Sequence, residues 1–378
     1  MSRIGSTKRS NRSDVLSIIM ARQPISRKQV AELLGISPAA VTNIVDELIQ
    51  SGLVMEGDFG EASIRGGRRP IFLKIAAESG LVLSAVFRLH NARIAVCDLM
   101  GRVLSSQEYD QTFTDMEDLM TTMVPDMRDV IRQWGGQEKF WGAGISVPGT
   151  VENDRVRNSP ELGIEDYDLA GVLGQELGID ICVDKDVYLS ALGENWMGAG
   201  WDYSDFVVVT IGTGIGSAII IDNQIYHGHR GMAGEVGYLV TGSDSLTGGP
   251  YTMSEFGYFE KAASLRTLRQ QTGLSFRQTV NQSAEDETLR QRLFQNADQI
   301  CLGLASILSM LDPQAIILHG SYAAAEETVA EYIEKKLRYL TPVSCDIKFS
   351  RLGDQALTYG CVGTVWQKKC QMQFLPRH

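Results

Sequence analysis

The chain has 378 residues, of which 44% are hydrophobic and 21% are charged, and its formal net charge at pH 7 is −11. Length and composition are those of a soluble globular protein of two or three domains. No run of about 18 uncharged apolar residues occurs and the basic N-terminus lacks an apolar signal-peptide core, so we expect neither a membrane span nor secretion.

The distribution of charge and cysteine narrows the class of protein further. Residues 1–75 contain 11 basic and 7 acidic side chains, which leaves 24 basic and 39 acidic side chains in the remainder. A basic N-terminal segment on an acidic body is typical of a DNA-binding head joined to a sensing domain. The six cysteines are scattered without a C-x-x-C pair, which predicts reduced thiols and a cytoplasmic protein.

The first 78 residues have the pattern of a winged helix-turn-helix domain. Apolar spacing predicts a helix over residues 11–22 and a second over 27–34, capped by Ser26. Ser37 caps a third helix whose first position is a proline, as helix starts prefer. Helix, short glycine-containing turn and helix is the arrangement that places a recognition helix in the major groove of DNA.

The third helix turns small and hydrogen-bonding side chains outward, which suits close approach to base edges. These candidate DNA-contacting residues are Ser37, Ala39, Ala40, Thr42 and Asn43. Two short strands, over 53–56 and 71–75, enclose a basic wing whose arginines Arg65, Arg68 and Arg69 are expected to neutralise phosphates. A three-helix bundle with a solvated basic loop would give the same pattern, but element order, caps and charge together favour DNA binding.

From residue 81 onward, short strands alternate with helices, which predicts an α/β body of two lobes with a cleft between them. The first lobe is expected over residues 79–190 together with a C-terminal helix within 358–378. The second, oligomerising lobe is expected over 191–357, with separate helices at 285–295 and 297–311.

Five segments together resemble one known family. They are residues 67–70 (GRRP), 144–149 (GISVPG), 186–194 (DVYLSALGE), 210–216 (TIGTGIG) and 231–237 (GMAGEVG). On these motifs the chain resembles the ROK family (repressors, open reading frames and sugar kinases), specifically its transcriptional repressors. The resemblance covers nearly the whole chain and implies an actin-like, RNase H-like sugar-binding body and a homodimer or homotetramer.

The sequence departs from the family's kinases at several motifs. The loop that handles ATP phosphates in those kinases is matched by residues 87–91 (FRLHN), which contain no glycine, so we expect no catalytic residues and no ATP. Tyr238 stands where the family has a zinc-binding histidine. Residues 239–260 contain neither cysteine nor histidine, so neither a metal nor another cofactor is expected.

The resemblance also implies an effector site built from residues of both lobes. The candidates are Gly149, Glu161, Lys185, Asp186, Glu235, Tyr238 and Glu255. Asp186 and Glu235 are expected to accept hydrogen bonds from sugar hydroxyls, although both could instead be cap residues at the ends of elements. Lys185 has two equal interpretations: it pairs with an anionic effector such as a sugar phosphate, or it lies across Asp186 and Glu235.

We therefore expect a sugar-responsive transcription factor, most simply a repressor of carbohydrate-utilisation genes that binds a double-stranded DNA operator. Its effector would be a sugar or sugar phosphate bound between the lobes. The first alternative is an active sugar kinase with a DNA-binding head, which Asp186 favours. The second is a regulator switched by a protein partner, with a vestigial sugar site.

Overall fold

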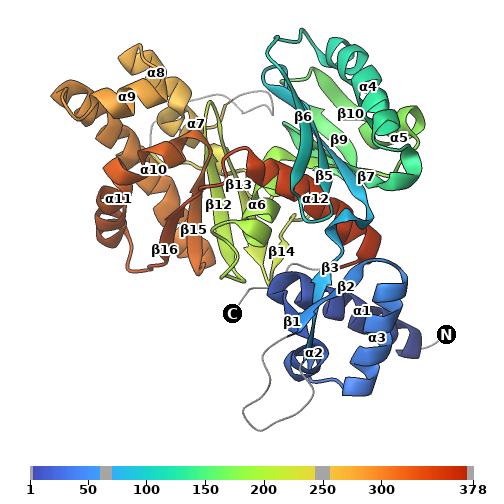
Figure 1. The fold of residues 1–378 in the computed structure, drawn as a ribbon. Helices are drawn as coiled ribbons and strands as arrows, with labels where there is room; N and C mark the ends of the chain where they lie inside the picture. The colour runs from blue at the N-terminus through green and yellow to red at the C-terminus, as the bar shows by residue number, and fades with distance from the viewer. Residues whose placement is uncertain (1–2, 60–69, 243–255, 373–378) are drawn as a thin grey trace. The chain divides into compact units, whose positions relative to one another are not determined.

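The computed structural model describes residues 3–59, 70–242 and 256–372, and the chain forms two compact units (Figure 1). The first unit comprises Met1–Leu189 and Leu357–His378, so it is discontinuous in sequence. The second unit is the continuous segment Ser190–Ala356. The chain thus passes between the units twice, once within a helix that follows Lys185 and once within the last helix.

The N-terminal part of the first unit is a winged helix. Its elements are α1 (Arg3–Arg22), β1 (Ile25–Ser26), α2 (Arg27–Leu34), α3 (Pro38–Gln50), β2 (Val54–Phe59) and β3 (Ile71–Ile75). The three strands form one antiparallel sheet in the order β1-β3-β2. The helix expected over 11–22 begins earlier, at Arg3, and the two-residue strand β1 was not expected.

Local chemistry explains why the turn between α2 and α3 is short. The Ser26 side chain accepts a hydrogen bond from the Gln29 backbone N–H, and the Gln29 side chain bonds back, forming a capping box. Gly35 ends α2 at φ 62°, in the left-handed region that glycine adopts without strain. The Ser37 hydroxyl then accepts the Ala40 N–H and starts α3.

The remainder of the first unit is built on a five-stranded sheet. Its strands are β4 (Leu81–Val86), β5 (Ala92–Asp98), β6 (Val103–Tyr109), β7 (Phe140–Val147) and β11 (Ile181–Lys185), in the order β11-β7-β4-β5-β6. Strands β11, β7 and β4 are parallel, so their carboxyl ends share one edge. A small antiparallel sheet contains β8 (Thr150–Glu152), β9 (Arg155–Ser159) and β10 (Ile164–Tyr167).

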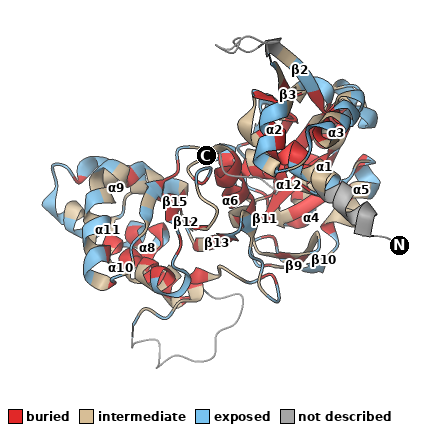
Figure 2. Ribbon diagram, turned by 90° about the horizontal axis from the view of Figure 1, so that it is seen from below, coloured by how far each residue is buried: buried red, intermediate tan, exposed pale blue. Residues whose placement is uncertain are grey.

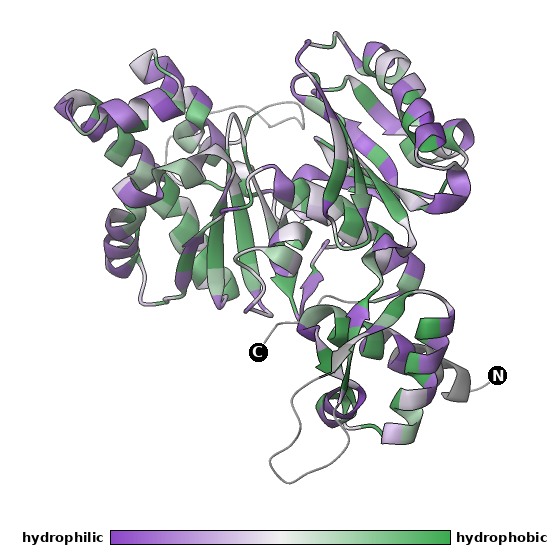
Figure 3. Ribbon diagram, viewed as in Figure 1, coloured by the Kyte–Doolittle hydropathy of each residue, from purple (hydrophilic) through white to green (hydrophobic). Residues whose placement is uncertain are grey.

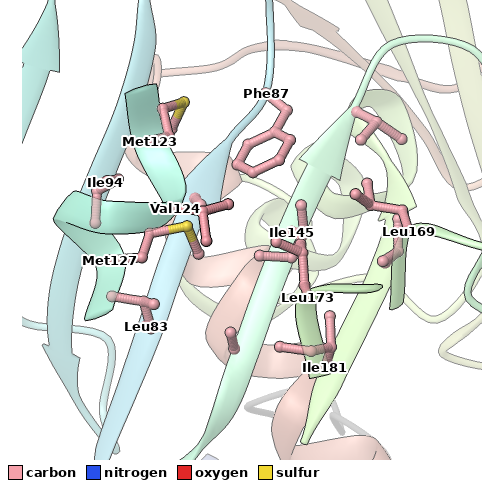
Figure 4. Packing of buried hydrophobic residues seen from close by; sticks show 14 of the residues in the cluster. Leu83, Phe87, Ile94, Met123, Val124, Met127, Ile145, Leu169, Leu173 and Ile181 are labelled. Atoms are coloured by element: carbon pink, nitrogen blue, oxygen red, sulfur yellow. The ribbon is translucent and has the colours of Figure 1, made fainter. Parts of the chain in front are cut away.

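Helices α4 (Met116–Gln133) and α5 (Leu169–Leu177) cover one face of the five-stranded sheet. Figure 4 shows this core: Phe87, directly after β4, and Ile145 of β7 pack in one cluster with Met123 and Met127 of α4 and Leu173 of α5. All five side chains are buried. Apolar contact of this kind is the main source of stability for such a layer.

Helix α12 (Gln355–Cys370) packs on the opposite face, and Figure 2 shows that most of it is buried. A Cβ added at Gly144 of β7 would overlap the backbone of Cys361 in α12. A Cβ added at Gly360 would likewise overlap the Leu189 carbonyl oxygen. The helix therefore lies backbone against backbone on its neighbours, which only glycine permits. The buried indole of Trp366 adds an Nε1–H hydrogen bond of 2.6 Å to the Leu99 carbonyl oxygen.

The second unit has its own five-stranded sheet. Its strands are β12 (Phe206–Ile211), β13 (Ile215–Ile221), β14 (Gln224–Ile225), β15 (Ala315–His319) and β16 (Asp346–Phe349), in the order β14-β13-β12-β15-β16. Figure 3 shows β12 and β15 as strongly hydrophobic strands, and both are almost fully buried.

Five helices pack in one hydrophobic core with this sheet. They are α7 (Tyr258–Ala263), α8 (Leu265–Thr272), α9 (Phe276–Gln282), α10 (Glu287–Leu311) and α11 (Glu326–Leu340), while α6 (Asp186–Met197) connects the two units. The expectation of two helices over 285–295 and 297–311 is wrong, because α10 is continuous. Asn296 sits inside it, where its side-chain N–H donates to the Ala263 carbonyl oxygen over 2.8 Å.

Short 3-10 helices complete the fold. They are η1 (Ala77–Ser79), η2 (Gln137–Lys139), η3 (Val236–Tyr238) and η5 (Gly320–Ala325). The combination of a winged helix and an α/β body with parallel and antiparallel strands agrees with the expected fold class.

The backbone contact of α12 leads to a prediction with a matched control. Gly360→Ala should lower the thermal midpoint clearly, because the new Cβ collides with the Leu189 carbonyl oxygen. Gly174→Ala in α5 makes the same substitution where the nearest atoms are 3.9 Å away, so helix propensity should stabilise it by up to ~1 kcal/mol. Thermal unfolding of both variants measures this, and equal midpoints would contradict the packing argument.

Candidate functional site

The outward face of α3 is available for a ligand. Val41, Ile44, Val45 and Leu48 are buried, which leaves the opposite side of the helix toward solvent. Of the candidate DNA-contacting residues, Ser37, Ala39 and Asn43 are exposed, and Ala40 and Thr42 are half-buried. Two of the hydroxyls are already used by the helix: Ser37 caps it, and Thr42 Oγ1 donates to the Pro38 carbonyl oxygen over 2.9 Å. The wing residues Arg65, Arg68 and Arg69 lie outside the described residues.

Arg27 is a residue of the head that sequence reasoning missed. Its Nη1 lies 2.7 Å from Asp46 Oδ1 on α3, and its Nη2 lies 2.9 Å from Glu56 Oε1 on β2. One guanidinium thus joins three elements and compensates two carboxylates, which would otherwise repel DNA phosphates. The partners are 19 and 29 residues away, so no local sequence pattern reveals them.

The carboxyl edge of the first sheet holds two candidate effector residues, Gly149 and Asp186, together with Arg88, which was not among the candidates. Arg88 follows β4, Gly149 follows β7, and Asp186 follows β11. Arg88 Nη2 lies 3.1 Å from Asp186 Oδ2, while Asp186 Oδ1 accepts the Val187 backbone N–H over 2.8 Å. Both side chains of the ion pair remain partly exposed, at 30% and 28%. Asp186 is therefore both the first residue of α6 and the partner of a cation.

The loop over residues 87–91 is anchored within the first unit. The Phe87 side chain is buried in the hydrophobic core. Its backbone N–H donates to the Ser146 carbonyl oxygen over 2.8 Å. The Leu89 N–H donates to Glu161 Oε1 over 3.2 Å. Glu161 thus holds this loop, and two backbone donors of the loop already have acceptors within the protein.

Lys185 and Gly149 have structural explanations beside the expected functional ones. The Lys185 side chain is buried, and its Nζ lies 4.0 Å from the centre of the Tyr188 ring. This is a cation–π contact between the last residue of β11 and the first turn of α6. Gly149 has φ 118°, and a Cβ there would overlap the Asn158 carbonyl oxygen. A turn between β7 and β8 therefore requires glycine whether or not a ligand binds.

Asp184 adds a titratable group that sequence reasoning did not single out. Burial, with a smaller contribution from the charge of nearby Asp154, raises its pKa to about 7 against the lowering effects of the Lys185 N–H and charge. Its Oδ1 accepts the Lys185 N–H over 2.8 Å. In the parallel register Asp184 stands beside Ser146 of β7, whose buried Oγ has no partner in the described part of the chain.

The remaining candidates belong to the second unit. Gly234 has φ 83° and sits against β13, where its carbonyl oxygen accepts hydrogen bonds from the Ser217 N–H and hydroxyl over 3.0 and 2.9 Å. Glu235 directly precedes η3, and Tyr238 is the last residue of η3. Glu260, which was not expected, accepts the Ile215 N–H over 2.9 Å, and burial raises its pKa. Glu255 and most of the loop before it lie outside the described residues.

Comparison with known proteins assigns the family. The model for the ROK family matches residues 89–368, and a model for winged helix-turn-helix DNA-binding domains matches residues 9–55. The chain belongs to the ROK family. The head of this ROK protein is accordingly of a DNA-binding type.

Similar proteins span nearly the same length as this ROK protein. It is 25% identical to the xylose repressor of Caldicellulosiruptor bescii, over 95% of this chain and 96% of the relative. It is 25% identical to the DNA-binding transcriptional dual regulator NagC of Escherichia coli K12, over 86% and 84%. A solved ROK transcriptional regulator, a homologue of the E. coli MLC protein, superposes with a TM-score of 0.81 over 96% of both chains at 23% identity.

Kinases share the body alone. A ROK glucokinase from Streptomyces griseus, solved with glucose and AMPPNP, matches 76% of this chain and 98% of its own, with a TM-score of 0.63 and 24% identity. This likeness shows the fold. Within the described residues, no group of three or more His, Cys, Asp or Glu side chains is placed to hold a metal ion. None of the described helices is long and apolar enough to cross a bilayer.

Asp184 predicts a pH dependence of stability. Its pKa of about 7 in the fold exceeds the ~3.9 of an unfolded aspartate, so the folded state binds more protons between these values. Its contribution to stability is full below pH ~4 and is lost as pH rises through 7. The free energy of unfolding relative to Asp184→Asn should therefore fall over pH 5–8. An exposed control, Asp129→Asn, should show no such trend in urea titrations, and a flat difference for Asp184→Asn would refute the assignment.

Arg27 predicts a separable effect on DNA affinity. Arg27→Ala leaves Asp46 and Glu56 uncompensated, so affinity for any duplex should fall several-fold in fluorescence anisotropy at low salt. Stability should change by about 1 kcal/mol or less, since the pairs are partly exposed. Arg132→Ala on α4 removes an equal charge outside the head and serves as the control. If both variants bind DNA with equal affinity, Arg27 does not contribute to DNA binding.

Proposed function

We propose that this ROK protein is a cytoplasmic, homo-oligomeric, sugar-responsive transcriptional regulator that represses carbohydrate-utilisation genes. The observation that carries the proposal is that one chain joins a winged helix with an open recognition face to a ROK body. Relatives of the same layout are named xylose repressor and N-acetylglucosamine repressor. A dimer or tetramer would bind an operator as two heads on half-sites separated by about one turn of DNA or a multiple of it.

We assign the DNA contacts to the α3 face and the wing, and the effector contacts to candidates of both units. Ser37, Ala39, Ala40, Thr42 and Asn43 would read base edges, and Arg65, Arg68 and Arg69 would neutralise phosphates. Gly149, Glu161, Lys185, Asp186, Glu235, Tyr238 and Glu255 would form the effector site. Support comes from the exposure of the α3 face and from the position of Asp186 at the carboxyl edge of parallel strands, where α/β folds bind ligands.

The packing of α12 supplies a physical route from body to head. The chain passes between the units inside α6, after Leu189, and inside α12, before Leu357. Further along α12, Trp366 bonds to the Leu99 carbonyl oxygen, and the Cys370 carbonyl oxygen accepts the Ser13 hydroxyl of α1 over 2.9 Å. An effector that favours one arrangement of the units would thus act on a helix that also contacts the head. Regulation requires that the effector bind one arrangement better than the other.

We propose that the protein is not an enzyme. In a sugar kinase the carboxylate that deprotonates the sugar hydroxyl must be free to take the proton. Here Asp186, which the resemblance to ROK kinases puts in the position of that base, is ion-paired with Arg88. The two alternatives are a sugar kinase with a DNA-binding head and a regulator switched by a protein partner. The following experiment distinguishes them from the proposed function.

The operator and the effector are tested together. DNA selected on the purified full-length chain should footprint as two half-sites, and a panel of sugars, sugar phosphates and sugar acids should contain a compound that changes affinity for it at least tenfold. A ligand at 100 times its Kd should also add about 2.7 kcal/mol of stability. Operator affinity that ignores every compound would refute the effector. ADP release on a sugar, abolished by Asp186→Asn, would instead establish the kinase.

A further inference from the structure

The Arg88–Asp186 ion pair lies at the ligand-binding edge of the sheet. Arg88 comes from the loop after β4, and Asp186 begins α6, 98 residues later. Among the described residues, Arg88 uses one of its nitrogens, Nη2, for this pair at 3.1 Å. A guanidinium carries five N–H donors in a planar fork. With 30% of its side chain exposed, Arg88 retains donors that a ligand can reach.

In the described part of the chain, three side chains near this pair, those of Glu161, His90 and Lys185, already contact groups of the protein. Glu161 is turned to the Leu89 backbone N–H, and His90 Nδ1 lies 3.0 Å from Thr112 Oγ1. The ammonium of Lys185 is buried over Tyr188. Asp186 holds Arg88 through one oxygen while the other caps α6 through the Val187 N–H.

Ligand charge determines what happens to this pair. A neutral sugar offers hydroxyl groups, which Asp186 can accept while it stays bound to Arg88. A ligand oxyanion competes with the carboxylate itself, because a guanidinium binds phosphate or carboxylate through two parallel hydrogen bonds. The single contact to Asp186 is weaker than such a bidentate arrangement. An anionic ligand would therefore take Arg88 and release Asp186.

We propose that Arg88 binds an oxyanion of the effector, which is a sugar carrying a phosphate or a carboxylate. The released Asp186 then accepts a hydroxyl of the same sugar. Because Asp186 is the first residue of α6, the helix in which the chain enters the second unit, exchange of the pair acts at a connection between units. This inference rests on the proposed function and adds the chemical class of the effector and the residue that recognises it.

The test compares matched ligands on the full-length chain. Glucose, glucose 6-phosphate and gluconate, and N-acetylglucosamine with its 6-phosphate, are titrated by calorimetry at low salt. At least one anionic member should bind about tenfold to a hundredfold more tightly than its neutral counterpart. Arg88→Gln should abolish that difference, and Arg88→Lys, which keeps the charge without the fork, should retain part of it. Comparing the affinities of the phosphate-bearing and carboxylate-bearing sugars identifies which oxyanion the protein recognises.

Arg128→Gln is the matched control, since it removes an arginine paired with Glu176 elsewhere in the first unit. It should preserve the preference for the anion, and circular dichroism should show that both glutamine variants are folded. A neutral sugar that binds as tightly as its anionic partner, or a preference that survives in Arg88→Gln, overturns the proposal while leaving a sugar-responsive regulator intact. Failure of every compound to bind refutes both this inference and the proposed function.

Discussion

The first unit depends on the close approach of α12 to β7 and α6. Gly144 and Gly360 remove the side chains that would separate these backbones. Within the second unit, Gly193 of α6 approaches the Ala356 carbonyl oxygen of α12 in the same way. Near contact of this kind tolerates little adjustment, because interiors are packed as densely as crystals. The sheet gains a buried second face, the head gains a neighbour in Cys370, and both crossings of the chain between units lie in these two helices.

A second constraint is electrostatic and recurs in head and body. In each, one arginine compensates carboxylates at a surface where the ligand is expected to be anionic: Arg27 for Asp46 and Glu56, and Arg88 for Asp186. On our proposals, the same cation that neutralises these carboxylates in the free protein would also donate hydrogen bonds to the ligand.

Local signals in the sequence were sufficient for much of the fold. The Ser26 and Ser37 caps and Gly35 act within a few residues, so the start and end of α2 and the start of α3 followed from them. The continuity of α10 could not be predicted in this way, because the Asn296 side chain donates its hydrogen bond to the Ala263 carbonyl oxygen, which lies outside α10. Likewise, the partners of Arg27 and Arg88 lie far along the chain, and composition or periodicity contains no information about them. The assignments of wing and effector residues stay predictions.

The discontinuity of the first unit has a consequence for synthesis. Ser190–Ala356 is continuous, so the second unit has all of its strands and helices once residue 356 has left the ribosome. The sheet of β11, β7, β4, β5 and β6 is translated earlier, yet the face that receives α12 stays uncovered until that helix emerges. Domains usually fold from the N-terminus as they are made. Here the later unit can finish first, while Val86 of the sheet and Leu189 of α6 lack their apolar partners Leu357 and Cys361 until α12 is made.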